Sequence, residues 1–290
     1  MVELLSMYLV HSLALTGALC SAGATIFTRL GLHGHDAYTA SWINMVVGTV
    51  GLWGAVYLVP PQETLHARGL LFFILAGLIG TVGGRLFRSV GIEKVGASVA
   101  AAITNLNPFI SIGLAILLLG ERVTLPILVG TSIIVLGTIV LSASGRHVGF
   151  HPRHLVYPFL SATCFGVVAI LRKLGLSQMG PLLGYTINVT TALIAFSAFL
   201  LVSGKRRAMV CKGRSLWYFI AAGVAENAGV FLILNALNLG TVSIVAPLYG
   251  AAPLFVLLMS FVFLKGVETL SGRVILGIVL LVLGVYLLII

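Results

Sequence analysis

The sequence contains very little charge. Only 8% of its 290 residues are Asp, Glu, Lys or Arg, and 59% are hydrophobic. Soluble globular proteins carry about 25% charged residues, because they need them to cover their surface. The composition therefore indicates an integral membrane protein. It excludes a cytosolic enzyme and a nucleic-acid-binding module, even though the net charge is +10.

Motifs for several kinds of chemistry are also absent from the sequence. Three cysteines are too few and too scattered for a disulfide framework or a metal site. The chain has no G-x-x-x-x-G-K-[ST] loop for ATP, no H-E-x-x-H zinc motif and no G-x-S-x-G nucleophile elbow. Because no basic n-region precedes the first apolar run, we expect that run to be a retained span. The sequence predicts no enzyme activity, no cofactor and no metal.

Long apolar runs make up most of the chain. A helix needs about 20 apolar residues to cross the hydrocarbon core of a bilayer. The runs are continuous and do not alternate, which excludes a porin-like barrel. The sequence therefore predicts an all-α integral membrane protein with ten transmembrane helices. The expected spans are residues 8–28, 38–59, 70–90, 95–120, 124–143, 155–174, 180–203, 215–237, 241–264 and 272–290.

The basic residues at span ends predict how the chain is oriented. Ten crossings bring both termini to one face of the membrane. The opposite face carries eleven basic residues, and positive residues favour the cytoplasmic side. We therefore expect both termini on the outer, periplasmic side of the cell (inner) membrane. The basic residues assigned to the face with the termini are four: Arg68, Arg122, Arg172 and Lys173.

The two halves of the chain resemble each other. Matching residues recur at an offset that drifts only from 144 to 147, which predicts two copies of a five-helix unit, residues 1–146 and 147–290. Because five is odd, the second copy starts from the opposite face. We therefore expect two inverted repeats around a central cavity, as in secondary transporters. Examples of matching pairs are Cys20 and Cys164, Asn44 and Asn188, Pro108 and Pro253, and Glu121 and Glu268.

Short motifs add a family resemblance. N-L-N-P at 105–108 followed by G-E-R-V-T at 120–124 resembles the EamA half-repeat of the drug/metabolite transporter superfamily. The second half carries A-P at 252–253 and E-T-L-S at 268–271, with two extra residues between the proline and the glutamate. The resemblance implies a ten-helix basket with a central pocket, used mostly to export small metabolites such as amino acids, amines or sugars.

The paired prolines and glutamates of the two halves have structural interpretations. Pro108 and Pro253 lie inside the fourth span of each half, where proline removes a backbone hydrogen bond and kinks the helix. Such kinks are either plain bends or hinges that line the cavity and gate it. Glu121 and Glu268 each stand just before an apolar helix, and we expect them to cap the positive end of that helix.

Ionisable residues inside the spans are costly in hydrocarbon and therefore indicate function. Glu226 is the acidic residue in mid-span, and three interpretations stay open for it. In the first interpretation it has a structural role and pairs with Arg85 or bonds to Asn227. In the second it contacts an amine of the solute, and in the third it couples transport to protons. Arg85 is a candidate ligand for a substrate carboxylate or phosphate. Arg88, nearer the span end, is expected to extend to the membrane interface.

Polar and aromatic residues inside the spans predict a substrate pocket, because small-molecule sites combine aromatic walls with a few polar groups. Two alternatives to a pocket role stay open. Trp42 and Tyr185 could belong to the aromatic belt at the membrane interface, and Asn44 and Asn188 could form hydrogen bonds between helices. We expect Asn105, Asn107, Asn227 and Tyr249 to bond the solute, and Trp42 and Tyr185 to cover its apolar part. The predicted substrate-binding set is Trp42, Asn44, Arg85, Asn105, Asn107, Tyr185, Asn188, Glu226, Asn227 and Tyr249.

Together these features predict a secondary transporter. We expect it to export a small polar metabolite, an amino acid or related amine, by alternating access, driven by the solute gradient or by protons. An antiporter of anionic phosphorylated metabolites is an alternative, but it needs several deep cations and Arg85 alone qualifies. A lipid flippase or membrane enzyme is the alternative from another class. The expected partners are the solute and membrane lipid, with no nucleic acid, in a monomer or homodimer.

Overall fold

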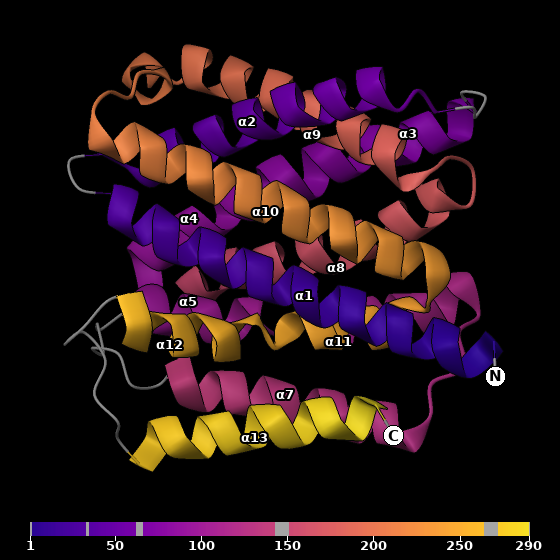
Figure 1. The fold of residues 1–290 in the computed structure, drawn as a ribbon. Coiled ribbons are helices and arrows are strands. Elements are labelled where there is room, and N and C mark those ends of the chain that lie inside the picture. Colours follow the sequence, from indigo (N-terminus) through magenta and orange to yellow (C-terminus); the bar gives the residue numbers. More distant parts are fainter. Residues whose placement is uncertain (1, 33–34, 62–65, 143–150, 264–271, 290) are drawn as a thin grey trace.

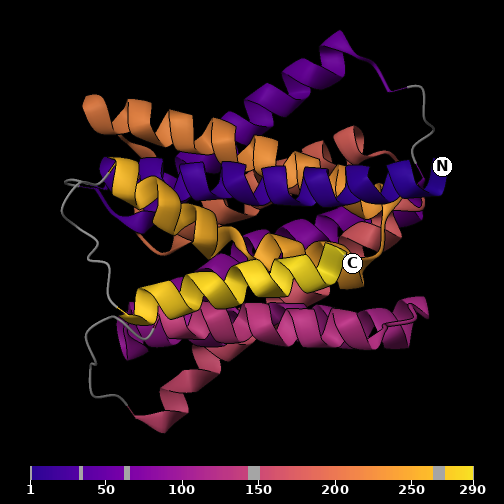
Figure 2. The same cartoon turned by 60° about the horizontal axis from the view of Figure 1, so that its bottom comes forward.

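A computed structural model describes residues 2–32, 35–61, 66–142, 151–263 and 272–289, and all the regular elements within these ranges are helices. Ten of its helical segments are long and apolar enough to cross a membrane, so the predicted ten-span, all-α membrane fold is confirmed. Both views place the N- and C-terminal ends toward the same end of the bundle (Figures 1 and 2), which we call the terminal side.

The first five spans contain several helical segments, because spans three and four are interrupted. Span three changes from α-helix to a wider π-helical stretch and back, and span four is divided in two. The elements are α1 (Val2–Gly31), α2 (Ala37–Leu58), α3 (Ala67–Ala76), η1 (Gly77–Gly84), α4 (Arg85–Val95), α5 (Ala97–Thr104), α6 (Asn107–Leu114), η2 (Ala115–Leu119) and α7 (Leu125–Ser142).

The last five spans are more regular, except that span nine is also divided in two. Two short 3-10 turns precede spans six and eight. The elements are η3 (Pro152–Leu155), α8 (Val156–Leu176), α9 (Pro181–Val202), η4 (Arg206–Met209), α10 (Arg214–Leu239), α11 (Val242–Gly250), α12 (Ala252–Phe263) and α13 (Gly272–Ile289).

The packing of the helices follows a matched pattern in the two halves. Helix α1 packs along α10 and also contacts α11 and α12. Its counterpart α8 packs along α3, η1 and α4, and also contacts α5 and α6. Helices α2 and α9 pack against each other, as do α7 and α13. The contacts of spans one to five therefore correspond to those of spans six to ten, and each half buries its apolar faces mainly against the other.

Close pairs of glycines allow the two tightest of these contacts. A Cβ atom placed on Gly17 of α1 would lie 2.9 Å from the Gly229 carbonyl oxygen of α10, and one on Gly229 would lie 2.8 Å from that of Gly17. Gly130 of α7 and Gly284 of α13 approach in the same reciprocal way, at 3.0 and 2.8 Å. Small residues let membrane helices pack backbone to backbone, which gains dispersion energy that larger side chains would forfeit.

Spans four and nine are broken where the sequence predicted kinks. Helix α5 ends at Thr104 and α6 begins at Asn107, with Pro108 in its first turn. Pro253 occupies the same place in α12, directly after the turn at Ala251. Proline is well suited to the first turn of a helix, because its missing N–H has no partner there in any case. Each proline thus begins a new helix, which is a sharper interruption than the bend expected from the sequence.

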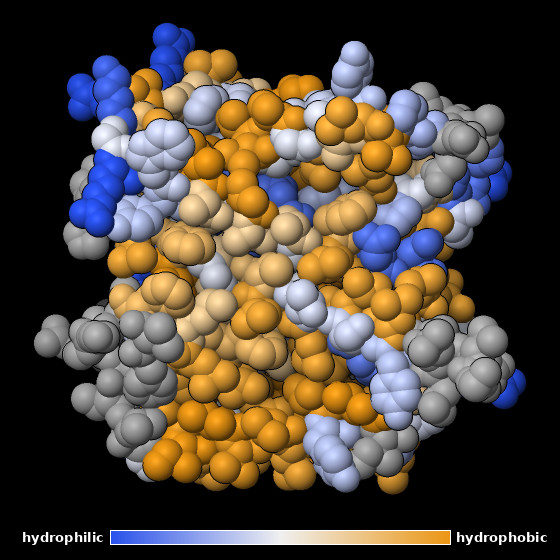
Figure 3. Space-filling model, viewed as in Figure 1, coloured by the Kyte–Doolittle hydropathy of each residue, from blue (hydrophilic) through white to orange (hydrophobic). Residues whose placement is uncertain are grey.

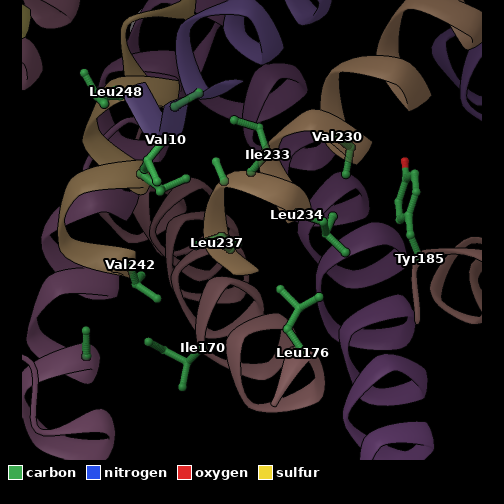
Figure 4. Close-up of a cluster of buried hydrophobic side chains, with 14 of the residues drawn as sticks. Val10, Ile170, Leu176, Tyr185, Val230, Ile233, Leu234, Leu237, Val242 and Leu248 are labelled. Carbon is green, nitrogen blue, oxygen red and sulfur yellow. The ribbon is translucent and has the colours of Figure 1, made fainter. Parts of the chain in front are cut away.

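A large apolar cluster of the bundle extends to residues on the terminal side. Val10 lies close to the amino terminus and Leu288 close to the carboxyl terminus, and both are buried in this cluster. Figure 4 shows how the side chains of the central helices meet, with Tyr185 at the edge of the group. Below we call these residues the terminal apolar cluster: Val10, Ile170, Leu176, Tyr185, Val230, Ile233, Leu234, Leu237, Val242, Leu248 and Leu288.

Candidate functional site

Three side chains from three helices meet near the middle of their spans. The Ser21 hydroxyl of α1 lies 2.9 Å from the Oε2 atom of Glu226 in α10 and 2.9 Å from the hydroxyl of Tyr249 in α11. An ionised carboxylate only accepts hydrogen bonds, and a serine has a single proton to give. Ser21 therefore donates to Glu226 and accepts from Tyr249, which links the two halves of the chain through a polar contact.

Two arginines of α4 lie beside this carboxylate. The Nη2 atom of Arg85 is 3.9 Å from Oε1 of Glu226, and the two side chains remain 26% and 22% exposed. This distance is too long for a hydrogen bond, so the pair is a loose ionic contact. Arg88 follows one helical turn later, and its charge interacts with Glu226, Arg85 and Tyr249. Two guanidinium groups and one carboxylate therefore share this part of the bundle.

Arg88 was expected to extend to the membrane interface, and the structure leaves its side chain exposed. The charges of Glu226 and Arg85 act on this guanidinium. In Figure 3, hydrophilic atoms are visible in a recess between apolar ones in the upper half of the molecule.

The chain forms an unusual helix directly before these arginines. Residues 77–84 of η1 follow a π-helical path, which is wider than an α-helix and is frequent at functional sites. Glycine makes this path possible beside α8, since a Cβ atom on Gly80 would lie 2.1 Å from Val168 and one on Gly84 would lie 2.9 Å from Phe165. The close approach of η1 to α8 fixes the point from which Arg85 and Arg88 project.

A second group of polar residues centres on Asn227, the neighbour of Glu226. The Tyr185 hydroxyl donates to Oδ1 of Asn227 at 2.8 Å. The Asn227 amide donates to the carbonyl oxygens of Asn44 at 3.1 Å and Gly223 at 2.7 Å. These bonds tie α2, α9 and α10 together, and they satisfy an amide that would otherwise be buried without partners.

Arg172 of α8 holds a third position in the core. Its Nη2 and Nε atoms donate to Oδ1 of Asn188 at 2.9 and 3.2 Å, and its guanidinium lies 5.9 Å from the centre of the Tyr185 ring. Tyr185 in turn donates to Asn227, the residue after Glu226. Arg172 therefore belongs to the same polar network as Glu226 and Asn227. The core network comprises Ser21, Arg85 and Arg88 from the first half, and Arg172, Tyr185, Asn188, Glu226, Asn227 and Tyr249 from the second.

The structure brings together most, but not all, of the residues predicted for a pocket. Asn44 reaches the core network through its backbone carbonyl. Trp42 instead donates its indole N–H to Ser197 at 3.0 Å within the α2–α9 contact. Asn105 and Asn107 lie at the break between α5 and α6, where the Asn107 amide donates to the Thr104 carbonyl at 3.0 Å. The residues of the prediction that join the network by their side chains are Arg85, Tyr185, Asn188, Glu226, Asn227 and Tyr249.

Sequence reasoning missed three members of the core network. Arg172 was assigned to a loop on the terminal face because Lys173 follows it, although it lies within the predicted sixth span. Arg88 was placed at the interface. Ser21 is a single hydroxyl in an apolar run, and nothing in the sequence distinguishes it from the serines that bond to their own helix.

Glu121 caps a helix, but not the one expected. Its carboxylate accepts from the backbone N–H groups of Val242 at 2.8 Å and Ser243 at 2.9 Å, at the start of α11. The expectation was that it caps the following helix, α7. Lys173 binds the other side of the same turn, donating to the carbonyl oxygens of Leu237 at 2.6 Å and Gly240 at 2.7 Å. The corresponding cap proposed at Glu268 lies outside the described residues.

Metal binding has no candidate in the ranges that the structure describes, since no three His, Cys, Asp or Glu side chains gather there. What the network offers instead is a set of charged and hydrogen-bonding groups between the two halves of a ten-span bundle.

Comparison with known proteins agrees with this architecture. The chain is a multi-pass membrane protein of the transporter class. A sequence profile of the EamA-like transporter family matches residues 9–143 and again residues 154–290, so the chain belongs to the EamA-like transporter family. The family resemblance seen in the sequence is therefore confirmed.

Individual relatives are distant. The chain is 21% identical to an uncharacterized transporter of Archaeoglobus fulgidus over 95% of its own length and 96% of that protein. It is also 29% identical to an uncharacterized protein of Methanocaldococcus jannaschii, over 36% of this chain and 75% of that protein. A solved crystal structure has the same fold, with a TM-score of 0.79 at 17% identity, and the match covers 95% of this chain and 96% of the other.

Proposed function

We propose that this transporter moves a small polar metabolite by alternating access between two inverted five-helix halves. The observation that carries the proposal is the core network, in which Ser21 and Arg85 of the first half meet Glu226 and Tyr249 of the second near mid-span. Buried ionisable groups are costly in a membrane and persist where a substrate or ion uses them.

The packing supports an exchange between two states. Helix α1 packs on α10 as α8 packs on α3, η1 and α4, so either half can adopt the arrangement of the other. The residues of the terminal apolar cluster are buried in the structure, and under the proposal they exclude water on one side of the core network. Under the proposal, the halves exchange conformations, the terminal apolar cluster separates, and the network opens toward the terminal side.

The proposed orientation places both termini outside, with solute leaving the cell. Arg172 and Lys173 were counted on the terminal face, but their side chains bind inside the bundle. Subtracting these two from the four basic residues leaves Arg68 and Arg122 on that face, against eleven on the other. The revised count supports a cytoplasmic location for the opposite face more strongly than the sequence alone did.

The proposed solutes are an amino acid or a related metabolite, with a phosphorylated anion as the second candidate. An amino acid would place its carboxylate at Arg85 and Arg88 and its amine at Glu226. The anionic candidate was ranked lower because Arg85 seemed to be the one deep cation. Arg88 now favours it, because it follows Arg85 by one turn of α4 and supplies a second cation near Glu226.

Flux into proteoliposomes tests the proposal. Purified protein is reconstituted, loaded with an unlabelled solute mixture and supplied with labelled amino acids, amines or sugar phosphates. We expect accumulation of one class that disappears in Arg85→Gln and persists in Arg207→Gln, an exposed loop control. A pH gradient that changes this flux supports proton coupling through Glu226, and unchanged flux in Glu226→Gln at every pH contradicts it. Absence of flux for every class contradicts transport.

A further inference from the structure

We propose that Arg85 and Arg88 form a subsite for an oxyanion group of the solute, a carboxylate or a phosphate, and that Glu226 serves as its internal counter-ion when the carrier is empty. The inference rests on the proposed transport function and specifies the chemistry of the solute. It begins from the loose contact of 3.9 Å between Arg85 and Glu226 and the adjacent position of Arg88.

The charges of this subsite do not balance. Two guanidinium groups face one carboxylate, which leaves one positive charge uncompensated. Among the described residues, Glu226 is the acidic group whose charge reaches Arg88. An uncompensated cation within a membrane-spanning helix is unfavourable. A bound anion supplies the missing negative charge, whereas a bound cation makes the imbalance worse.

The hydrogen-bonding capacity of the two arginines is also largely unused. A guanidinium has five N–H donors arranged to bind the two oxygens of a carboxylate or phosphate. Within the described part of the chain, neither Arg85 nor Arg88 donates a hydrogen bond to a protein acceptor. The Arg85 side chain is 26% exposed and Arg88 is also exposed. Exposed donors without a protein acceptor are available to a ligand.

Arg172 shows what an arginine with a structural role looks like in the same core network. Its donors bind Asn188 at 2.9 and 3.2 Å, and its face lies against the Tyr185 ring. These bonds fix α8 to α9 and leave few donors for a ligand. The contrast singles out Arg85 and Arg88 as the binding pair and assigns Arg172 to support.

Glu226 is held in a way that suits a counter-ion that can be displaced. Its Oε2 atom accepts a short hydrogen bond from Ser21, while its Oε1 atom contacts Arg85 only loosely. An incoming oxyanion can therefore take over Arg85 without breaking a short ion pair, and Glu226 keeps its bond to Ser21. In the empty carrier, Glu226 offsets one of the two positive charges, which permits the halves to exchange without solute.

Binding in detergent tests the subsite independently of transport. Thermal unfolding of the full chain is measured with inorganic phosphate, succinate, chloride and methylammonium at equal ionic strength. We expect phosphate or succinate to raise the unfolding midpoint more than chloride, and the stronger of the two identifies the phosphate or carboxylate class. The rise of the unfolding midpoint in the oxyanion relative to chloride should vanish in Arg85→Gln and Arg88→Gln and persist in Arg207→Gln. The comparison with Arg207→Gln removes general effects of salt on stability.

The unfolding midpoint measured in chloride shows whether each variant is folded. If Arg85→Gln does not fold, Arg85→Lys is used in its place, because it retains the positive charge. Stabilisation by methylammonium in place of the oxyanions overturns the subsite. So does an oxyanion increment that survives in both glutamine variants. Glu226→Gln removes the competing carboxylate and should tighten oxyanion binding about tenfold. Weaker oxyanion binding in this variant also overturns the role of Glu226.

Proteoliposomes loaded with the oxyanion that binds more tightly then separate the two proposals. We expect Glu226→Gln to keep exchange of labelled for unlabelled anion but to lose most net efflux, because its empty carrier holds two uncompensated cations. Oxyanion binding without exchange or efflux contradicts the transport function and leaves the subsite intact. Flux of an amine or neutral solute that phosphate and succinate do not inhibit contradicts the subsite and leaves transport intact.

Discussion

Glu121, in the loop between spans four and five, binds the backbone N–H of Val242 at the first turn of α11 at 2.8 Å. The contact joins the first half of the chain to the second on the terminal side. Lys173 holds the end of α10 in the same turn. A carboxylate and an ammonium group thus satisfy the free backbone groups where α10 ends and α11 begins.

Removal of this cap should destabilise the protein. Glu121→Ala leaves the N–H groups of Val242 and Ser243 without an acceptor, and we expect a loss of about 1–3 kcal/mol in the free energy of unfolding. Thermal or denaturant unfolding in detergent measures the loss. Glu93→Ala is the matched control, because Glu93 is exposed and contacts only its neighbour Lys94 among the described residues. Equal stability of the two variants would contradict the cap.

The contact between α1 and α10 should tolerate no side chain at Gly17. Gly17→Val places a Cβ atom 2.9 Å from the Gly229 carbonyl oxygen, so the helices must separate. We expect a loss of about 1–3 kcal/mol from overpacking, measured by the unfolding midpoint. At Gly51 of α2 a Cβ atom meets nothing within 4 Å, so Gly51→Val is the control. A stable Gly17→Val variant would show that this interface is looser than described.

Asn188 should be essential as an acceptor for Arg172. Asn188→Leu removes the oxygen that both donors of the guanidinium share, and leaving buried donors without an acceptor costs about 1–3 kcal/mol. Asn188→Asp keeps an acceptor and should preserve folding. The readout is the yield and unfolding midpoint of the purified variants. If Asn188→Leu and Asn188→Asp are equally stable, the Arg172 contact does not stabilise the core.

Cys211 offers a test of topology and of its own environment. It lies between spans seven and eight, and burial raises the pKa of its thiol. A raised pKa leaves less thiolate at neutral pH, so maleimide labelling should be slow at pH 7 and accelerate above pH 8. With Cys20 and Cys164 replaced by alanine, an impermeant maleimide should label inside-out vesicles and not intact cells. The reverse pattern would place the termini inside.

The sequence predicted the ten spans because apolar length is a local property that needs no knowledge of packing. It also identified Glu226 and Arg85, since mid-span charges are rare enough to stand out. The bonds between the halves could not be predicted in this way. Glu121 caps α11 across 121 residues of sequence, and Ser21 meets Glu226 across 205. Both contacts depend on how the halves dock.

Proline and arginine show the other limits of sequence reasoning. Pro108 predicted an interruption of span four, but whether the helix bends or breaks depends on the turn at residues 105–106 and its local hydrogen bonds. Arg172 and Lys173 looked like a pair of charges at a membrane face. In the structure, one binds Asn188 and the other caps α10, because the span extends to Leu176 and keeps both inside the bundle.

Alternating access is tested most directly by locking the terminal side. Cysteines at Arg122 and Thr241, exposed neighbours of the Glu121–Val242 contact, are joined by a short cleavable thiol reagent in a protein without native cysteines. We expect joining to abolish flux in proteoliposomes and cleavage to restore it, while each single cysteine stays active. Undiminished flux through the joined protein would contradict the proposal that the halves separate on this side to release solute.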